Sequence, residues 1–139
     1  YSLDRAVIVG PQGSHIDFQK LKVVRYFKKH CFNLPVQTHD VSGFLFCIHR
    51  ERFASHSLTF DVQFSPCFFE EWDMGLQVIR AGLACYAVPV TGFDHHWGVS
   101  RLEKNDSVNY FGNEVNLRDV HHKNKKKFIE KWQHVIAFS

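Results

Sequence analysis

The stretch from Phe68 to Pro89, FFEEWDMGLQVIRAGLACYAVP, indicates a helix followed directly by a strand. Acidic residues fill the expected first turn, apolar side chains follow at helical spacing, and Gly82 ends the helix. The short apolar run at 84–88 then stops at a proline, which is typical of a strand. A helix that leads into a strand favours an α/β fold.

Four further elements are predicted upstream of this stretch. The run from Arg5 to Gly10 is apolar and leads into a Gly-Pro-Gln-Gly turn, so it predicts a strand. Residues 18–30 carry an apolar stripe at helical spacing and predict a helix. The segment from Val41 to Ile48, VSGFLFCI, predicts a buried strand, and a short helix or turn is expected to begin at His49.

Two elements are predicted downstream. A second short strand is expected at 90–93, before the sequence Asp94-His95-His96. Phe128, Trp132 and their apolar neighbours follow helical spacing behind a run of lysines, which predicts a C-terminal amphipathic helix. The expected architecture is therefore a mixed sheet flanked by helices.

Composition limits the function classes. The chain has 139 residues, the size of one domain, and 45% of them are hydrophobic, so a packed core is expected and disorder is excluded as the main state. The net charge of +3 is too small to argue for nucleic acid. No apolar run reaches the length of a membrane span. Four widely spaced cysteines favour reduced thiols, and a first residue other than Met suggests a piece of a longer protein.

The acidic cluster Glu70, Glu71 and Asp73 is the first candidate site. Three carboxylates within four positions repel one another, which raises a pKa and suits a general base or a cation ligand. The alternative is that these acids simply favour the first turn of a helix.

The pair His95-His96, at the end of a predicted strand, is the second candidate site. Neutral imidazole is a common metal ligand, but neighbouring residues of a strand point to opposite faces, so one histidine is expected to face the site. Gly43, inside an apolar segment, suggests a close approach by a ligand or by another backbone segment, or else a bulge. Arg50 and Arg52 are candidates for phosphate contact, or for an exposed turn.

An ordered set of short motifs runs through the chain from about Val41 to Ser100. It comprises Val41-Ser42-Gly43, Arg50, Phe53, Phe60-Asp61, Phe69-Glu70-Glu71-Trp72-Asp73, Ala81-Gly82, Val88-Pro89 and His95-His96-Trp97-Gly98-Val99-Ser100. In order and spacing this set resembles the C-terminal half of an inverting glycosyltransferase of the GT-A type, from the large family two class that uses nucleotide-sugar donors.

The resemblance implies roles for particular residues. The general base of the family falls on Glu71, where the family usually has Asp, and Asp73 and Glu70 are the alternatives. The family's downstream histidine, which binds Mg²⁺ or Mn²⁺ on the donor diphosphate, falls on His95 or else His96. The residues implied for the donor and acceptor pocket are Ser42, Gly43, Arg50, Trp72 and Trp97.

The resemblance also implies partners. These are a nucleotide-sugar donor and a carbohydrate, lipid-linked or protein acceptor, in the cytoplasm, at the cytoplasmic face of a membrane, or in a Golgi-type lumen. The nucleotide-binding half, with its Asp-x-Asp, is expected before Tyr1, so the 139 residues alone are expected to be inactive.

Two other functions stay open. One is a non-catalytic module that binds carbohydrate or protein, and the other is a metal-binding domain built on His15, His39 or His49. The basic C-terminal helix predicts peripheral contact with an anionic membrane, or only a solvated face.

Overall fold

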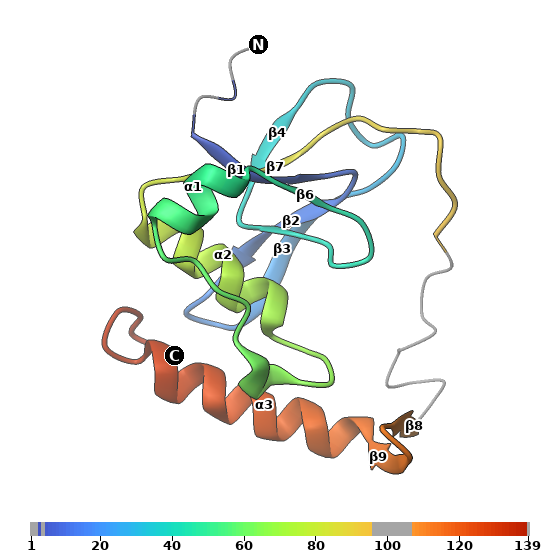
Figure 1. Cartoon of the computed structure of the whole chain (residues 1–139), viewed down its shortest axis with the longest axis vertical. Coiled ribbons are helices and arrows are strands. Elements are labelled where there is room, and N and C mark those ends of the chain that lie inside the picture. The colour runs from blue at the N-terminus through green and yellow to red at the C-terminus, as the bar shows by residue number, and fades with distance from the viewer. Residues whose placement is uncertain (1–2, 4, 96–106, 139) are drawn as a thin grey trace.

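The computed structural model describes residues 3, 5–95 and 107–138, and they form an α/β fold with a mixed sheet. The strand order in this sheet is β4-β7-β1-β6 (Figure 1). The central strands β1 (Ala6–Gly10) and β7 (Ala84–Ala87) are parallel. The edge strands β6 (Cys47–Ile48) and β4 (Val36–Thr38) are antiparallel to them. The strands predicted at 5–10 and 84–88 are confirmed.

A second sheet has the order β3-β2-β5 and is antiparallel throughout. It contains β2 (Gly13–Asp17), β3 (Lys22–Phe27) and β5 (Asp40–Val41). The chain passes from the first sheet to the second between β1 and β2, and again at His39 between β4 and β5. These two crossings connect the sheets directly.

The prediction of a helix at 18–30 is wrong, because this segment contains the second strand of the β2–β3 hairpin. Five positions of β2 pair with β3, with a bulge after His15. Of the apolar residues that suggested a helical stripe, Leu21 lies in the turn before β3, and Val24 and Phe27 lie on opposite faces of the strand. Phe27 is buried, whereas Val24 is 69% exposed. Backbone pairing with β2 therefore outweighs the local pattern.

The buried strand predicted at 41–48 is mostly wrong as well. Strand β5 ends at Val41, the chain forms a loop over 42–46, and β6 covers only the last two residues, both exposed. Residues 90–93 are also not a strand, since β7 ends at Ala87. The chain thus leaves the second sheet at Val41 and the first sheet at Ala87.

The helices agree better with the sequence. Helix α1 (Arg50–Ser55) begins where the turn after His49 was predicted, and α2 (Glu70–Arg80) confirms the helix of the deciding stretch. A short 3-10 helix, η1 (Val62–Phe64), lies between them. The C-terminal helix is confirmed as α3 (Leu117–Trp132), and it follows a hairpin of β8 (Ser107–Tyr110) and β9 (Asn113–Asn116). No helix among the described residues is long and apolar enough to cross a bilayer.

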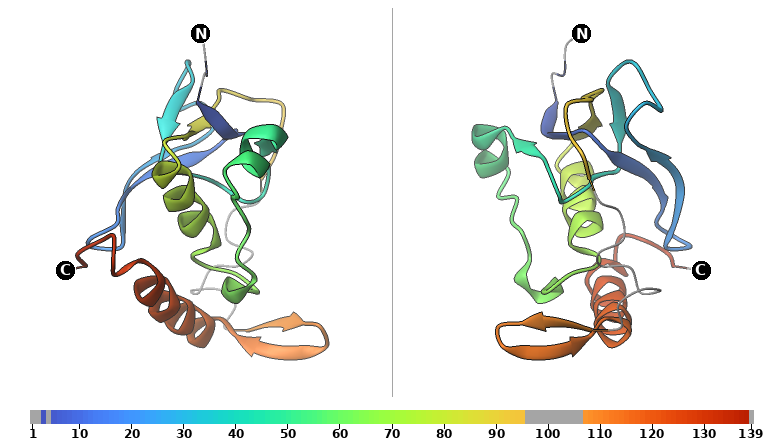
Figure 2. Two further views of the ribbon diagram at one scale, coloured as in Figure 1. Left: turned by 60° about the vertical axis from the view of Figure 1, so that its left-hand side comes forward. Right: turned by 90° about the vertical axis from the view of Figure 1, so that its right-hand side faces the viewer.

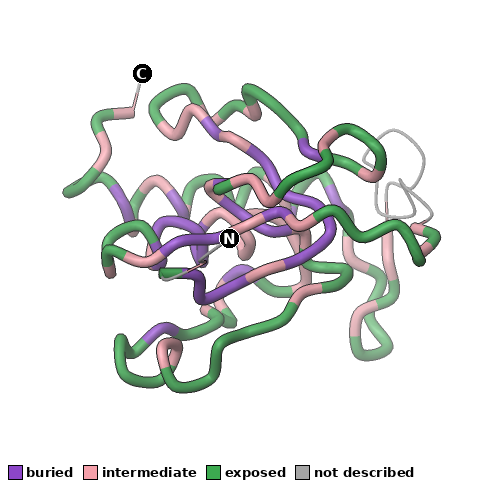
Figure 3. The backbone as a smooth tube through the Cα atoms, turned by 90° about the horizontal axis from the view of Figure 1, so that it is seen from above, coloured by how far each residue is buried: buried purple, intermediate pink, exposed green. Residues whose placement is uncertain are grey.

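Helix α2 lies between two hydrophobic clusters. On one face Met74 and Val78 pack with Val7, Ile8 and other residues of the sheet side. On another face Leu76 packs with Phe64, Phe128 and Trp132, and this second cluster joins α2 to α3. Figure 2 shows α3 running across the end of the molecule opposite the sheet, with α2 between them. Figure 3 shows the buried backbone concentrated in the centre, where these elements meet.

Candidate functional site

The chain enters α2 through an unusual turn. Phe68 and Phe69, the two residues before the helix, both have left-handed backbones, with φ of 74° and 73°. This conformation costs a bulky L-residue roughly 1–2 kcal/mol. Strain of this kind persists only where the surrounding structure imposes it, and it is found most often at functional sites. The turn decides where the first carboxylates of α2 project.

The three acids of the first turn point in different directions, because successive helical residues are rotated by about 100°. Asp73 faces α3 and is 1% exposed. It accepts hydrogen bonds from Trp132 Nε1 at 2.8 Å and Gln77 Nε2 at 2.7 Å, and it forms an ion pair with Lys131 at 2.7 Å. These contacts occupy both carboxylate oxygens. Asp73 therefore joins α2 to α3 and does not line either cavity.

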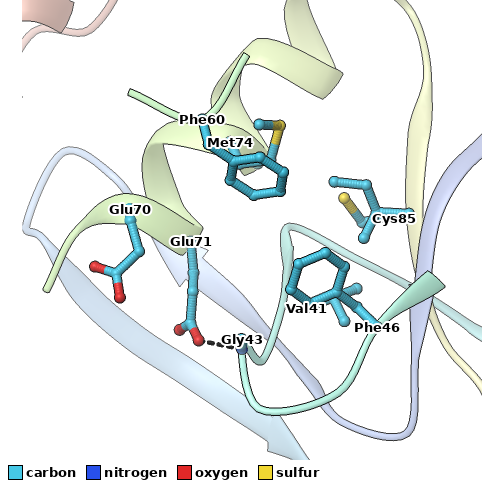
Figure 4. Close-up of a pocket in the computed structure, with 10 residues that line it drawn as sticks. Val41, Gly43, Phe46, Phe60, Glu70, Glu71, Met74 and Cys85 are labelled. Carbon is cyan, nitrogen blue, oxygen red and sulfur yellow. Dashed lines mark hydrogen bonds between the residues drawn. The ribbon is translucent and has the colours of Figure 1, made fainter. Parts of the chain in front are cut away.

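Glu71 faces the opposite way, toward the loop after β5. Its Oε1 accepts a hydrogen bond from the backbone N–H of Gly43 (Figure 4). A Cβ at Gly43 would lie 2.8 Å from that same oxygen, so the approach requires glycine. The unexpected glycine of the sequence is thereby explained as a close contact between loop and carboxylate.

The pKa of Glu71 is raised to about 7. Burial among protein atoms is the main cause, and the nearby carboxylates of Asp40 and Glu70 raise it further, against the lowering effect of the Gly43 hydrogen bond. A carboxyl group with this pKa exchanges protons near neutral pH, as a general base must.

Two cavities meet at these carboxylates. The inner cavity, of about 220 Å³, lies between α2 and the sheet and has mainly apolar walls that include Val41, Phe46 and Met74. The aromatic cavity, of about 350 Å³, lies toward α3 and is walled by Phe68, Phe69, Trp72, His121, Lys125 and neighbouring residues. Glu70 and Glu71 line both cavities.

Glu70 is the less restrained of the two acids. Its Oε2 is buried and has no hydrogen-bond partner among the described residues. Burial raises the pKa of Glu70 as well, against one hydrogen bond from its own backbone. A buried carboxylate oxygen without a protein partner is a group available to a ligand.

The loop at 42–46 also reaches His95. The ring of Phe44, next to Gly43 in the chain, stacks on the His95 ring with centroids 3.8 Å apart and planes 11° apart. One loop therefore contacts Glu71 through Gly43 and His95 through Phe44. His96 and Trp97, the other residues singled out here, lie outside the described residues.

The described residues do not assemble a metal site. Within 3, 5–95 and 107–138, no three His, Cys, Asp or Glu side chains gather in a way that could hold an ion. The Mg²⁺ or Mn²⁺ ion and its ligands His95 and His96 stay a prediction, and we derive no step through a metal. His15 and His39 have their rings 5.3 Å apart, but His39 Nδ1 is hydrogen-bonded to the Ile16 backbone and His49 caps α1.

The remaining predicted residues are divided. Trp72 lines the aromatic cavity, and Ser42 flanks Gly43 with its N–H donating to the Gln12 carbonyl at 3.0 Å. Arg50 begins α1, is exposed, and is not among the residues lining either cavity. Arg52 donates from Nη1 to the Ala6 carbonyl at 2.7 Å and the Leu3 carbonyl at 3.3 Å, so part of its guanidinium is engaged within the protein.

Several site residues on α3 are absent from the sequence predictions. His121 and Lys125 line the aromatic cavity, and Asn124 donates hydrogen bonds to the chain that leads into α2. Asn124 did leave one signal: it lies four residues from both Val120 and Phe128, so it is a polar residue within the buried stripe of the helix. Its partners are 56 to 60 residues away in sequence, which no local pattern shows.

Comparisons with protein-family models, curated proteins and solved structures gave no match to this chain.

Proposed function

We propose that these residues form the acceptor side of an inverting glycosyltransferase, in which Glu71 removes the proton from the acceptor hydroxyl. The observation that carries the proposal is the place of Glu71, a carboxylate with a raised pKa at the junction of two cavities. The ordered motifs of the sequence support the same function, because Gly43 and Glu71, from separate motifs, meet in the fold.

The geometry of Glu71 suits a positioned base. Gly43 holds Oε1 through its backbone N–H, and we assign the other oxygen, Oε2, to the acceptor hydroxyl. A base acts best when its pKa is near the working pH, since it is then ionised and still accepts a proton. The raised pKa of about 7 meets this condition for Glu71. Transfer is therefore expected to rise with pH through this value.

The aromatic cavity is the place we assign to the acceptor. Pyranose rings carry C–H groups on their faces, and the indole of Trp72 offers an apolar surface of matching shape. Polar groups for the ring hydroxyls come from His121, Lys125 and Glu70 on the surrounding walls. Its volume of about 350 Å³ is also within the usual range for ligand pockets.

The reaction we propose is a single displacement. The acceptor oxygen forms a bond to the anomeric carbon while the bond from that carbon to the nucleoside diphosphate breaks. The acceptor proton goes to Glu71, and the diphosphate leaves with the bonding electron pair. Attack from the face opposite the leaving group inverts the anomeric carbon.

The test compares Glu71→Gln with the parent in the natural full-length protein. Nucleoside diphosphate release is measured over a panel of nucleotide sugars with simple glycosides as acceptors. We expect Glu71→Gln to lower kcat by about 10²- to 10⁴-fold, the usual contribution of a general base. Glu51→Gln, an exposed acid in the first turn of α1, is the matched control and should keep full activity.

The result that contradicts the proposal is equally specific. The parent could bind the glycosides but release no diphosphate from any donor, and Glu71→Gln could bind the glycosides equally well. Such a protein would be a carbohydrate-binding module. Equal turnover by the parent and by Glu71→Gln would remove Glu71 from the role of base.

A further inference from the structure

A single side chain on α3 contacts three backbone carbonyls in the chain that leads into α2. Asn124 Nδ2 lies 2.6 Å from the Phe64 carbonyl oxygen, 2.8 Å from that of Cys67 and 3.4 Å from that of Phe68. Asn124 is 1% exposed. The amide nitrogen of Asn124 thus contacts three carbonyls of one segment, and this segment includes the left-handed turn.

The turn needs an external restraint. Phe68 and Phe69 hold left-handed backbones at an energetic cost, and Phe69 offers no side-chain cap to the helix that follows. The aromatic rings fix one side of the turn, since Phe69 lies 5.3 Å from Phe128 and 5.4 Å from Trp72 between centroids. Among the described residues, Asn124 is the side chain whose hydrogen bonds fix the backbone carbonyls of the same turn.

We propose that Asn124 is a positioning residue for Glu71: by holding the carbonyls of Phe64, Cys67 and Phe68, it keeps the left-handed turn in the one conformation that places the carboxylate between the two cavities. This inference rests on the proposed function, because it assigns a reason for the position of its base.

The amide of Asn124 interrupts the buried apolar stripe of α3. The stripe on either side of Asn124 is apolar, with Val120 one turn before it and Phe128 one turn after. An apolar residue would continue that stripe, but it would leave the carbonyls of Phe64, Cys67 and Phe68 without this donor. The N–H groups of the amide fix the orientation of the backbone carbonyls in the turn, because hydrogen bonds are directional.

The same helix offers a matched control. Lys127 donates from Nζ to the Gln63 carbonyl, so it also ties α3 to the segment before α2. That carbonyl belongs to η1 and lies outside the left-handed turn. A variant of Lys127 therefore weakens the attachment of α3 and leaves the turn's own hydrogen bonds in place.

The experiment uses Asn124→Leu, Asn124→Asp and Lys127→Met in the full-length protein. Leu has a similar size and no donors, and an ionised Asp has the same shape and no donors. Two properties are measured: steady-state transfer, as kcat and acceptor KM, and the titration of Glu71 by ¹³C NMR of its labelled carboxyl group. The ionisable groups around Glu71 are Glu70 on α2, Asp40 on β5, Cys85 on β7, and His121 and Lys125 on α3, and all of them are unchanged in the three variants.

We expect both Asn124 variants to lower kcat by about 10- to 100-fold, as for a catalytic group displaced by about 1 Å, with a much smaller change in KM. The Glu71 titration should move toward that of an ordinary glutamate, because a relaxed turn lets water reach the carboxylate. Lys127→Met should leave the titration where it is in the parent.

Other outcomes overturn the proposal. An unchanged titration and an unchanged kcat in both Asn124 variants would show that the turn does not need the amide. An equal shift in Lys127→Met would assign the effect to the docking of α3 in general. If both Asn124 variants fail to fold while Lys127→Met folds, Asn124 serves the fold and not the base.

The failure of the proposed function gives a separate result. The parent protein could show no transferase activity while the Glu71 titration still shifts in the Asn124 variants. That result would contradict the glycosyltransferase function. The positioning of Glu71 by Asn124 would stand in that case.

Discussion

At the scale of single residues, Glu71 lowers the stability of the protein at neutral pH. Its folded-state pKa of about 7 is above the ordinary value of 4.5, so the folded protein favours the neutral carboxyl. Asp40, raised to about 6 mainly by burial, acts in the same direction. For an acid with a raised pKa, stability is complete below the unfolded-state value and is lost as pH rises toward the folded-state value.

The first prediction follows from this sign. Between about pH 4.5 and 7 the parent should lose stability that Glu71→Gln retains, because glutamine mimics the neutral acid. The difference in unfolding free energy should reach about 3 kcal/mol at most at pH 8. Urea unfolding of both proteins at pH 4 and pH 8 measures it. Parallel pH dependences would show that Glu71 has no raised pKa.

Gly43 gives the second prediction. A methyl group there would meet Glu71 Oε1, the mobile end of a side chain, and the backbone of Gly43 is not in the left-handed region. Gly43→Ala should therefore move the carboxylate at little cost to stability, and transfer should fall by about 10- to 100-fold. The control is Gly92→Ala, whose added methyl meets open space. Activity equal to that of the control would contradict the contact.

At the scale of elements, one face of α2 packs against the sheets and another packs against α3. Glu71, Gly75 and Val78 follow one another at spacings of four and three, and this stripe packs on the sheet side. Asp73 and Leu76 form a second stripe toward α3. The helix therefore presents its base and its attachment to α3 on different faces.

Gly75 sets the distance between α2 and the sheets, which gives the third prediction. A Cβ at Gly75 would lie 2.1 Å from the His39 carbonyl oxygen, and both partners are backbone-fixed. Alanine normally favours a helix over glycine by about 1 kcal/mol. Here Gly75→Ala should instead destabilise the protein by about 1–3 kcal/mol, as overpacking does. A rise in thermal stability would contradict the close approach.

The attachment of α2 to α3 gives the fourth prediction. Asp73→Asn removes the charge that pairs with Lys131 but leaves an oxygen for Trp132, and Lys131 keeps its ion pair with Asp61 at 2.7 Å. We expect a loss of roughly 2 kcal/mol of unfolding free energy. Lys126→Met, which removes only an exposed ion pair with Glu130, should cost less than about 0.5 kcal/mol. Equal costs for the two variants would contradict a buried network at Asp73.

These elements also show what the sequence could predict. The helix at 70–80 has its signals in its own residues, an acidic start and a glycine after its end, so it was found. The β3 strand and the loop at 42–46 were misjudged, because their partners β2 and Glu71 are elsewhere in the chain. The acidic cluster that contains Glu71 was visible in the sequence, whereas the contacts of Asn124 could not be inferred, since they join segments more than 50 residues apart.

At the scale of the whole molecule, the basic run of α3 is divided between the interior and the surface. Lys127 donates a hydrogen bond to the Gln63 carbonyl, and Lys131 forms ion pairs with Asp61 and Asp73. Lys123, Lys125 and Lys126 are exposed. Only part of the positive charge that suggested membrane contact is therefore free to meet a charged surface.

The fifth prediction concerns that contact. Three exposed lysines contribute about 1 kcal/mol each at an anionic bilayer surface, which is too little for stable attachment at physiological salt. Sedimentation with vesicles containing phosphatidylserine should therefore occur only at low salt. It should disappear when these three lysines are replaced by glutamine, and persist in Lys127→Met. Sedimentation at 0.15 M salt would show that further residues reach the lipid.

The placement of α2 between two clusters has a consequence for folding. Loss of the contacts with α3 would expose Leu76 and leave the buried carboxylate of Asp73 without its cationic partner, while loss of the contacts with the sheet would expose Met74 and Val78. Neither half of the molecule keeps a complete interior without the other. Residues 5–95 and 107–138 are thus thermodynamically interdependent and should melt as one cooperative unit.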